Sequence, residues 1–181
     1  MTQLNALGGE WRNFLQLGEH NTLKSDFYQP IDDSQKYFVN PYFLYQRYNL
    51  GLDNAQYGRN SSFWINRTQI GLDLGHNLDS WGRLSLGVNY SSGKNEVRFG
   101  NPYDHAGDFN DSSYYLKLQA DTLDSVNFPT TGYSGSLVFR NALTALSADE
   151  DFYTLSLDWT HAYTWDQYSI IPRIRLAGRT S

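Results

Sequence analysis

Residues 82–91, GRLSLGVNYS, alternate between apolar and polar side chains with a period of two. The apolar members are Leu84, Leu86, Val88 and Tyr90, and the intervening residues are Arg83, Ser85, Gly87, Asn89 and Ser91. Successive side chains of a β-strand point to opposite faces of its sheet, so this stretch predicts a strand with one apolar and one polar face. If the apolar face contacts lipid, Arg in place of Leu86 should destabilise the protein far more than Arg in place of Ser85.

The same alternation recurs outward from this stretch, notably along 112–122, 151–163 and 167–178. Helical periodicity is nearly absent, because Gly or Asn interrupts almost every candidate window. Strand-like runs are predicted at 9–18, 22–31, 36–50, 62–78, 82–99, 112–123, 132–143, 151–164 and 167–178. Consecutive strands imply hairpins, so the sequence predicts an all-β, antiparallel up-and-down arrangement.

Composition excludes several classes of function. The chain has 14 Tyr, 10 Phe and 5 Trp but no Cys and only four His, so neither a disulfide framework nor a thiolate metal site is expected. A net charge of -5 without a basic stripe argues against nucleic acid as a partner. No stretch approaches the ~18 apolar residues of a membrane helix. We therefore expect no metal and no cofactor.

The connections between the predicted strands differ in length. The segments PIDDSQK, NLDSWGR and TWDQY are tight and 124–131 is compact, whereas GLDNAQYGRN (51–60) and GNPYDHAGDFND (100–111) are longer and polar. Outer-membrane barrels have short periplasmic turns and longer extracellular loops. The pattern therefore favours a transmembrane β-barrel of about 8 to 10 strands, with residues 1–181 as one barrel domain.

A soluble β-sandwich or barrel that binds carbohydrate or lipid would alternate as well, and it stays open as the alternative. Two observations favour the membrane barrel. The runs 62–78 and 82–99 exceed the ~5–6 residues typical of globular strands. The polar side also combines small and charged residues, as a wet interior does. The residues predicted to face the lumen are Arg67, Asp73, Arg83, Lys117, Arg140, Asp158, Arg173 and Arg175.

Aromatic residues gather at both ends of the apolar stretches, as expected of rings at a membrane interface. Phe128 lies in the turn FPTTG (128–132), where Pro129 ends the pairing and Gly132 can take the positive φ that starts the next strand. The predicted membrane-interface aromatics are Trp64, Trp81, Phe128, Tyr163, Trp165 and Tyr168.

Short motifs carry a family resemblance. The motif residues are Gly8-Gly9-Glu10-Trp11-Arg12, Leu17-Gly18, Phe27-Tyr28-Gln29-Pro30, the Phe128-Pro129 turn with Gly132, and the strand pair in 147–181. This pattern resembles the outer-membrane barrel of bacterial patatin-like autotransporters. That barrel belongs to the bacterial surface antigen superfamily, which includes the outer-membrane assembly factor and the two-partner secretion transporters.

The resemblance implies a translocator or anchor unit of type V secretion in the bacterial outer membrane, with a narrow pore and with lipid or detergent as partner. The family barrel has sixteen strands and a lipase or periplasmic domain before it, whereas nine runs and no attached passenger or catalytic domain are seen here. The chain therefore resembles a partial or shortened barrel. Its unpaired strand edges predict a homodimer. A further alternative is an engineered or truncated scaffold without activity.

Catalysis is not expected. His76 and His161 fall on the predicted lipid-facing side, with no Ser placed beside them as a nucleophile. GYSGS (132–136) nearly spells the G-x-S-x-G elbow, but its last residue is Ser136 and no helix follows. The sequence therefore predicts a protein that is not an enzyme.

Overall fold

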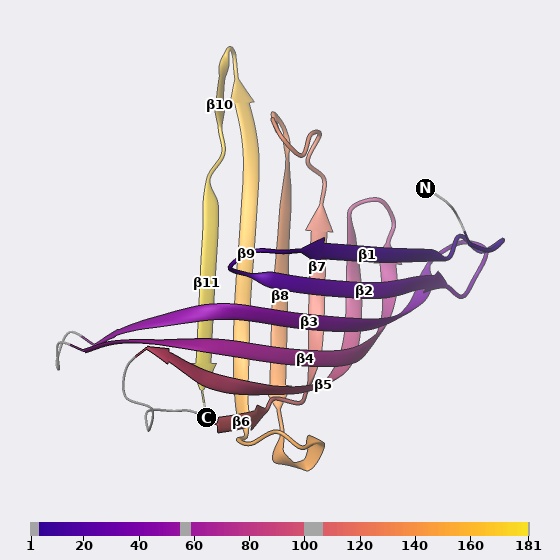
Figure 1. The fold of residues 1–181 in the computed structure, drawn as a ribbon. Coiled ribbons are helices and arrows are strands. Elements are labelled where there is room, and N and C mark those ends of the chain that lie inside the picture. The colour runs from indigo at the N-terminus through magenta and orange to yellow at the C-terminus, as the bar shows by residue number, and fades with distance from the viewer. Residues whose placement is uncertain (1–3, 55–58, 100–106, 181) are drawn as a thin grey trace.

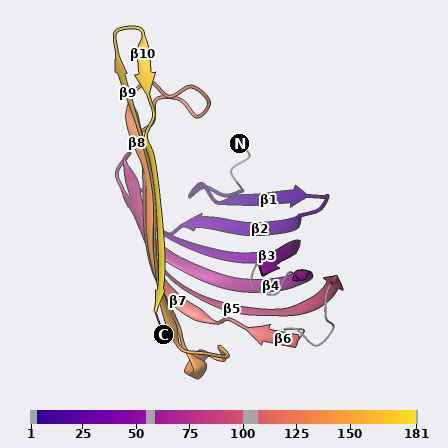
Figure 2. The same cartoon turned by 90° about the vertical axis from the view of Figure 1, so that its left-hand side faces the viewer.

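The computed structural model of the protein describes residues 4–54, 59–99 and 107–180, whose strands form one antiparallel sheet (Figures 1 and 2). The strands are β1 (Glu10–Gln16), β2 (Asn21–Pro30), β3 (Tyr37–Asn54), β4 (Arg59–Leu78), β5 (Gly82–Phe99), β6 (Gly107–Asn110), β7 (Ser113–Asp121), β8 (Gly132–Ala142), β9 (Phe152–Trp165), β10 (Tyr168–Ile170) and β11 (Arg173–Thr180). A single 3₁₀ turn, η1 (Thr144–Leu146), follows β8. The predicted all-β, antiparallel up-and-down fold is confirmed.

Ten of the eleven described strand segments fall in the nine runs predicted from the sequence, and β6 lies in the predicted loop 100–111. β6 and β7 both pair with β5, and β10 and β11 both pair with β9, so each pair of segments continues a single run along its neighbour. Pro172 separates β10 from β11 because proline has no N–H to donate to the ladder. Its carbonyl still accepts a hydrogen bond from the N–H of His161 at 3.1 Å.

The prediction of a long loop at 51–60 is wrong. The ladder of β3 and β4 continues to Asp53 opposite Asn60 and Asn54 opposite Arg59, so both strands run through most of this polar segment. Polar residues do not end a strand where a hairpin extends beyond the neighbouring strands, because both faces of the hairpin can contact water there. In the second predicted loop, 107–110 form β6, and 100–106 lie outside the described residues.

The sheet is strongly twisted and curved. β1–β3 run across the direction of β8–β11 in Figure 1, and Figure 2 shows β1–β5 extending to one side of the wall formed by β8–β11. In the described ladder β1 and β11 lie at opposite ends of the pairing order and do not pair with each other. The described sheet is thus a curved, open wall.

Cross-strand register sorts the side chains into two faces. Leu74 lies opposite Leu86, Leu86 opposite Leu116, and Leu116 opposite Phe139, which gives a continuous apolar row across four strands. One residue away, the row from Asp73 passes through Gly87 and Tyr115 to Arg140. We call the first side of the sheet the apolar face and the second the polar face.

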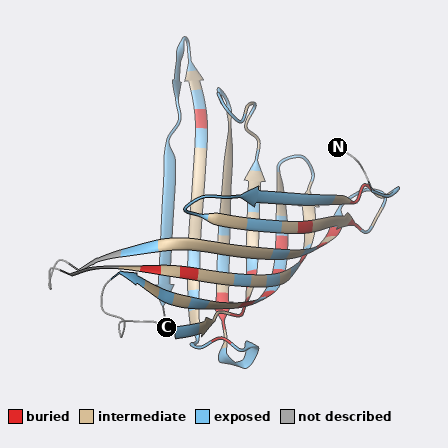
Figure 3. Ribbon diagram, in the orientation of Figure 1, coloured by how far each residue is buried: buried red, intermediate tan, exposed pale blue. Residues whose placement is uncertain are grey.

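Burial differs between the two faces, and Figure 3 maps it along the strands. On the polar face, Ser85 is 1% exposed and Ser91 and Ser113 are each 0% exposed. On the apolar face, Leu86 is 56% and Val88 51% exposed. The alternation predicted along 82–91 is confirmed. Because Ser85 is buried, however, Arg at this position would clash with its neighbours, which corrects the expectation that Ser85 tolerates it.

The polar face is filled largely by aromatic rings that lie over glycines of the neighbouring strand. A Cβ added to Gly87 would approach the ring of Tyr115, directly opposite, to 2.3 Å. The same cross-strand arrangement places Phe38 over Gly75, Tyr42 over Gly71 and Phe109 over Gly93. These glycines leave room for large rings against the inner wall, which explains how the polar face packs.

Candidate functional site

The polar face carries all eight residues predicted from the sequence to face the lumen. Register places them on one side of six strands, as Arg67 and Asp73 on β4, Arg83 on β5, Lys117 on β7, Arg140 on β8, Asp158 on β9, and Arg173 and Arg175 on β11. They do not form one cluster but divide into separate networks, described below. Their role in a lumen stays a prediction.

Asp73 is the centre of the first network and is buried. Its carboxylate accepts a hydrogen bond from the hydroxyl of Tyr115 and lies 3.6 Å from the ammonium of Lys117. The Tyr115 hydroxyl oxygen also lies 3.2 Å from Tyr42 Oη, which accepts a hydrogen bond from Gln69 Nε2 at 2.8 Å. A buried charge held by this many partners is compensated, so the network stiffens the inner wall.

Asp111 joins two arginines in the second network. Its carboxylate lies 3.3 Å from Arg67 Nη2 and forms an ion pair with Arg140. Each guanidinium also donates from Nε to a buried serine of the polar face, Arg67 to Ser91 at 2.8 Å and Arg140 to Ser113 at 2.7 Å. Sequence reasoning missed Asp111 because it lies between β6 and β7, outside any strand whose alternation could assign it a face.

Arg12 and Arg83 occupy the polar face nearer the short turns. Arg12 Nε donates to buried Asp26 at 2.7 Å. Arg83 stacks over the rings of Phe38 and Tyr28, at 4.7 Å and 4.9 Å from their centroids, and donates to Asn77 Oδ1 at 3.1 Å. Sequence reasoning also missed Arg12 and Asp26, although the alternation of 22–31 could have assigned Asp26 to the polar side.

Asp158 pairs with two exposed arginines of the outermost described strand. Arg175 Nε lies 2.7 Å and Arg173 Nη2 3.2 Å from its carboxylate. The arginine side chains are more than half exposed, so solvent screens these pairs and they contribute little to stability.

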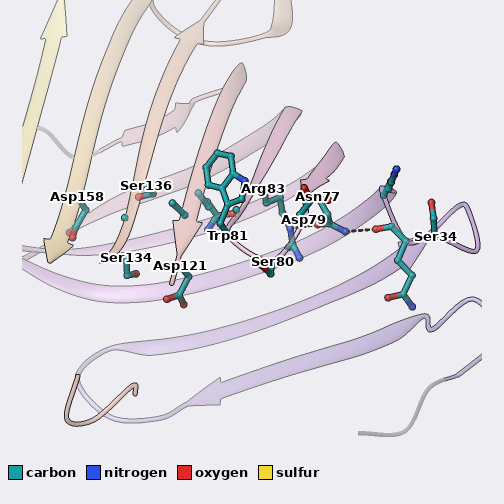
Figure 4. Close-up of a pocket in the computed structure, with 16 residues that line it drawn as sticks. Ser34, Asn77, Asp79, Ser80, Trp81, Arg83, Asp121, Ser134, Ser136 and Asp158 are labelled. Atoms are coloured by element: carbon teal, nitrogen blue, oxygen red, sulfur yellow. Dashed lines mark hydrogen bonds between the residues drawn. The ribbon is translucent and has the colours of Figure 1, made fainter. Parts of the chain in front are cut away.

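Two cavities lie along the polar face. One of about 600 Å³ contains the Asp73 network and is lined by Arg12, Tyr42, Arg67 and Val138 among others. The other, of about 910 Å³, opens at the short-turn end between Lys36, Trp81, Asp121 and Ser136 (Figure 4). Arg83 and Gln119 line both cavities.

Within the described ranges no group of His, Cys, Asp and Glu could hold a metal ion.

The six predicted interface aromatics occupy three environments. Phe128, 84% exposed, stands at the β7–β8 turn, and Tyr163, Trp165 and Tyr168 are exposed on the β9–β10 hairpin. Trp165 lies opposite Tyr168. Trp81 instead lines the larger cavity. Trp64 lies at the other end of the sheet, against Arg47 and Arg98.

The β7–β8 turn is held by Asp124. The hydroxyl and N–H of Thr130 and the N–H of Thr131 donate to its carboxylate and lower the pKa of Asp124 to about 2. Gly132 has φ of +97°, as predicted for the residue that restarts the strand. The exposed Phe128 is thus presented on a turn braced by side-chain hydrogen bonds.

The two histidines of the sequence analysis lie against aromatic rings. The ring centroids of His76 and Tyr37 are 4.8 Å apart, and those of His161 and Tyr133 are 6.5 Å apart. Residues 132–136 begin β8, with no helix after them in the described chain before η1. Among the described residues, no hydrogen bond joins either imidazole to a serine.

Comparison with known proteins gives one family and one fold. Residues 24–181 match the Omp85 superfamily domain. The fold is similar to the crystal structure of BamA from Haemophilus ducreyi lacking POTRA domains 1-3, with a TM-score of 0.67 at 14% sequence identity over 97% of this chain and 36% of that chain. At this identity the likeness concerns the fold alone, and this chain spans about a third of that one. No curated protein matches the sequence.

None of the described residues forms a helix long and apolar enough to cross a membrane.

Proposed function

This chain belongs to the Omp85 superfamily and lies in the bacterial outer membrane, and from that premise we propose that it is a translocator- or anchor-type barrel unit whose polar face lines a narrow pore. The observation that carries the proposal is the contrast between the faces, in which small polar side chains such as Ser85 are buried on the polar face and large apolar ones such as Leu86 are exposed on the apolar face. Exposed leucines on one continuous face favour contact with lipid, and a charged concave face favours contact with water.

The finer assignment concerns what the unit serves. The motifs that resemble patatin-like autotransporters support a role in type V secretion, in which the barrel anchors or helps to export an attached domain. We also propose that the unit itself is not an enzyme, since the polar face holds ion pairs and stacked rings rather than a nucleophile beside a base.

The edges of the sheet are the proposed site of a further partner. Eight antiparallel steps separate β1 from β11, so the two edge strands run in the same direction. Antiparallel closure therefore requires an odd number of additional strands. In a homodimer whose two copies have the same orientation in the membrane, β1 of one copy would pair with β11 of the other in parallel, which is the less stable pairing. Closure by other strands would leave one copy of this chain in each assembly, whereas homodimerisation would place two copies there. Light scattering in detergent, which gives the mass of one copy or two, distinguishes them.

Conductance tests the pore. We expect the closed assembly that contains this chain to pass small ions in a planar bilayer, and Arg83→Gln to lower its preference for anions, because Arg83 lines both cavities. Lys94→Gln removes one positive charge from the opposite face and is the control, expected to leave selectivity unchanged. A bilayer that stays at its baseline current, or equal effects of the two variants, would contradict the pore.

A further inference from the structure

Three basic side chains lie on the outward side of the sheet, beyond the apolar rows, at the end opposite the short turns. Arg47 on β3 lies opposite Asn66 on β4, which lies opposite Lys94 on β5. Trp64 is two residues further along β4, on the same face. Arg98 is the extra residue of a β-bulge, since Phe63 pairs with Val97 and Ser62 with Phe99. We call Arg47, Trp64, Lys94 and Arg98 the outward basic cluster.

The two arginines of the outward basic cluster converge on a single ring. The Cζ atoms of Arg47 and Arg98 lie 4.8 Å and 5.3 Å from the centroid of Trp64. Lys94 pairs with Glu96 at 3.5 Å, whereas neither arginine forms an ion pair with a described carboxylate. Arg47 Nε, although shielded from solvent, has no hydrogen-bond partner among the described atoms. The indole thus holds two guanidinium groups together while leaving donors without an acceptor.

The outward basic cluster lies just beyond the exposed side chains of the apolar face. Moving along the strands toward the short turns, the next cross-strand row is Tyr45, Thr68 and Ser92, and the row after that is Phe43, Ile70 and Tyr90. The last three side chains are all exposed on the apolar face. Four residues of strand correspond to ~13 Å, so the basic groups stand just beyond the apolar band. Long arginine side chains at this level extend toward the headgroups.

We propose that the outward basic cluster binds the phosphate-bearing headgroup of a lipid in the leaflet at the longer-loop end. Arg47 and Arg98 donate to phosphate oxygens, Trp64 holds both side chains in place, and the acyl chains lie along Phe43, Ile70 and Tyr90. Planar guanidinium groups suit phosphate because they donate two parallel hydrogen bonds. The site rests on lipid contact at the apolar face, but it does not depend on whether the polar face conducts.

Native mass spectrometry of the full chain released from nanodiscs tests the proposal. The nanodiscs contain phosphatidylcholine with a small fraction of diphosphoryl lipid A. We expect one diphosphoryl lipid to be retained, and Arg47→Ala combined with Arg98→Ala to reduce its retention about thirtyfold, with single variants near fivefold, from the effect of each basic residue near a charged surface. Arg47→Lys with Arg98→Lys should restore part of the retention.

Arg179→Ala is the matched control. Arg179 also stacks over an aromatic ring, 4.0 Å from the centroid of Phe152, but it belongs to the polar face. We expect the Arg179→Ala variant to retain lipid to within twofold of the unaltered chain. Heat-modified migration on a gel verifies that each variant is folded. Unchanged retention in the folded double variant, an equal loss in Arg179→Ala, or displacement of the lipid by millimolar inorganic phosphate would overturn the proposal. Loss of conductance with intact retention would instead overturn only the pore.

Discussion

Ser85 and Leu86 are neighbours on β5, yet the serine is 1% exposed and the leucine 56% exposed. The contrast recurs across the middle of the wall, where the row Leu74–Leu86–Leu116–Phe139 lies beside the row Asp73–Gly87–Tyr115–Arg140. The polar face packs against itself through rings over glycines, ion pairs and serine hydroxyls. The apolar face has no protein partner in the described chain. On the proposal that the apolar face contacts lipid, stability on the two faces has different sources, internal packing on one and the surrounding lipid on the other.

The largest difference between the faces is expected when the same charge is placed on either side of one strand. Leu137 belongs to the apolar face in the middle of β8, and its neighbour Ser136 lines the larger cavity opposite Asp158. We expect Leu137→Arg to lower the free energy of unfolding in lipid by ~2–4 kcal/mol, whereas Ser136→Arg should lower it by less than about 1 kcal/mol. Urea titration of the folded fraction in lipid vesicles measures both. Equal losses would contradict a lipid-facing Leu137.

Packing on the polar face is tested at its glycines. Gly87→Ala brings a methyl group against the Tyr115 ring and the Asp73 carboxylate, so we expect a loss of ~1–3 kcal/mol. Gly178 on β11 has no neighbouring atom within 4 Å of an added Cβ, and Gly178→Ala should change stability by less than about 0.5 kcal/mol. The same unfolding assay compares them. If both substitutions were neutral, the ring would not pack on Gly87.

The ion pairs of the polar face should differ with their burial. Asp111→Asn weakens the contacts to two arginines that are only 25% and 21% exposed, and we expect a loss of about 1–2 kcal/mol. Glu150→Gln disrupts the pair with Arg179, whose members are 74% and 55% exposed, and should cost at most a few tenths of a kcal/mol. Thermal unfolding in detergent checks the order, and a reversed order would contradict the assignment.

The smallest effect is confined to the turn that presents Phe128. The pKa of Asp124, about 2 in the folded chain, lies below its ordinary value of 3.8, so the carboxylate stabilises the turn above pH 3.8 and loses this effect as the pH falls toward 2. The amide proton shift of Thr130 in NMR spectra should therefore stay constant from pH 7 to about 4 and then move. Asp124→Asn should show the low-pH shift already at pH 7, and a midpoint near 3.8 in the unaltered chain would contradict the bracing.

Much of this architecture could be predicted because apolar and polar side chains alternate strictly along several strands. The run 82–99 was predicted with the same bounds that β5 has, and the eight residues assigned to the polar side share one face of the sheet. The extension of β3 to Asn54 and the start of β4 at Arg59 could not be predicted, since Asn and Gly are compatible with both a loop and a strand. Asp111 and the outward basic cluster depend on a gap between strands and on a β-bulge, neither of which has a periodic signal.

The central claim is that the apolar face contacts lipid and the polar face does not. Single nitroxide labels at Leu116→Cys, Lys117→Cys, Leu118→Cys and Gln119→Cys on β7 test it in lipid vesicles. Relaxation enhancement by oxygen, which concentrates in hydrocarbon, should be high at 116 and 118 and low at 117 and 119, while a water-soluble nickel chelate should not relax the labels at 116 and 118. Ready access of the chelate to 116 and 118, without alternation along the strand, would contradict the account.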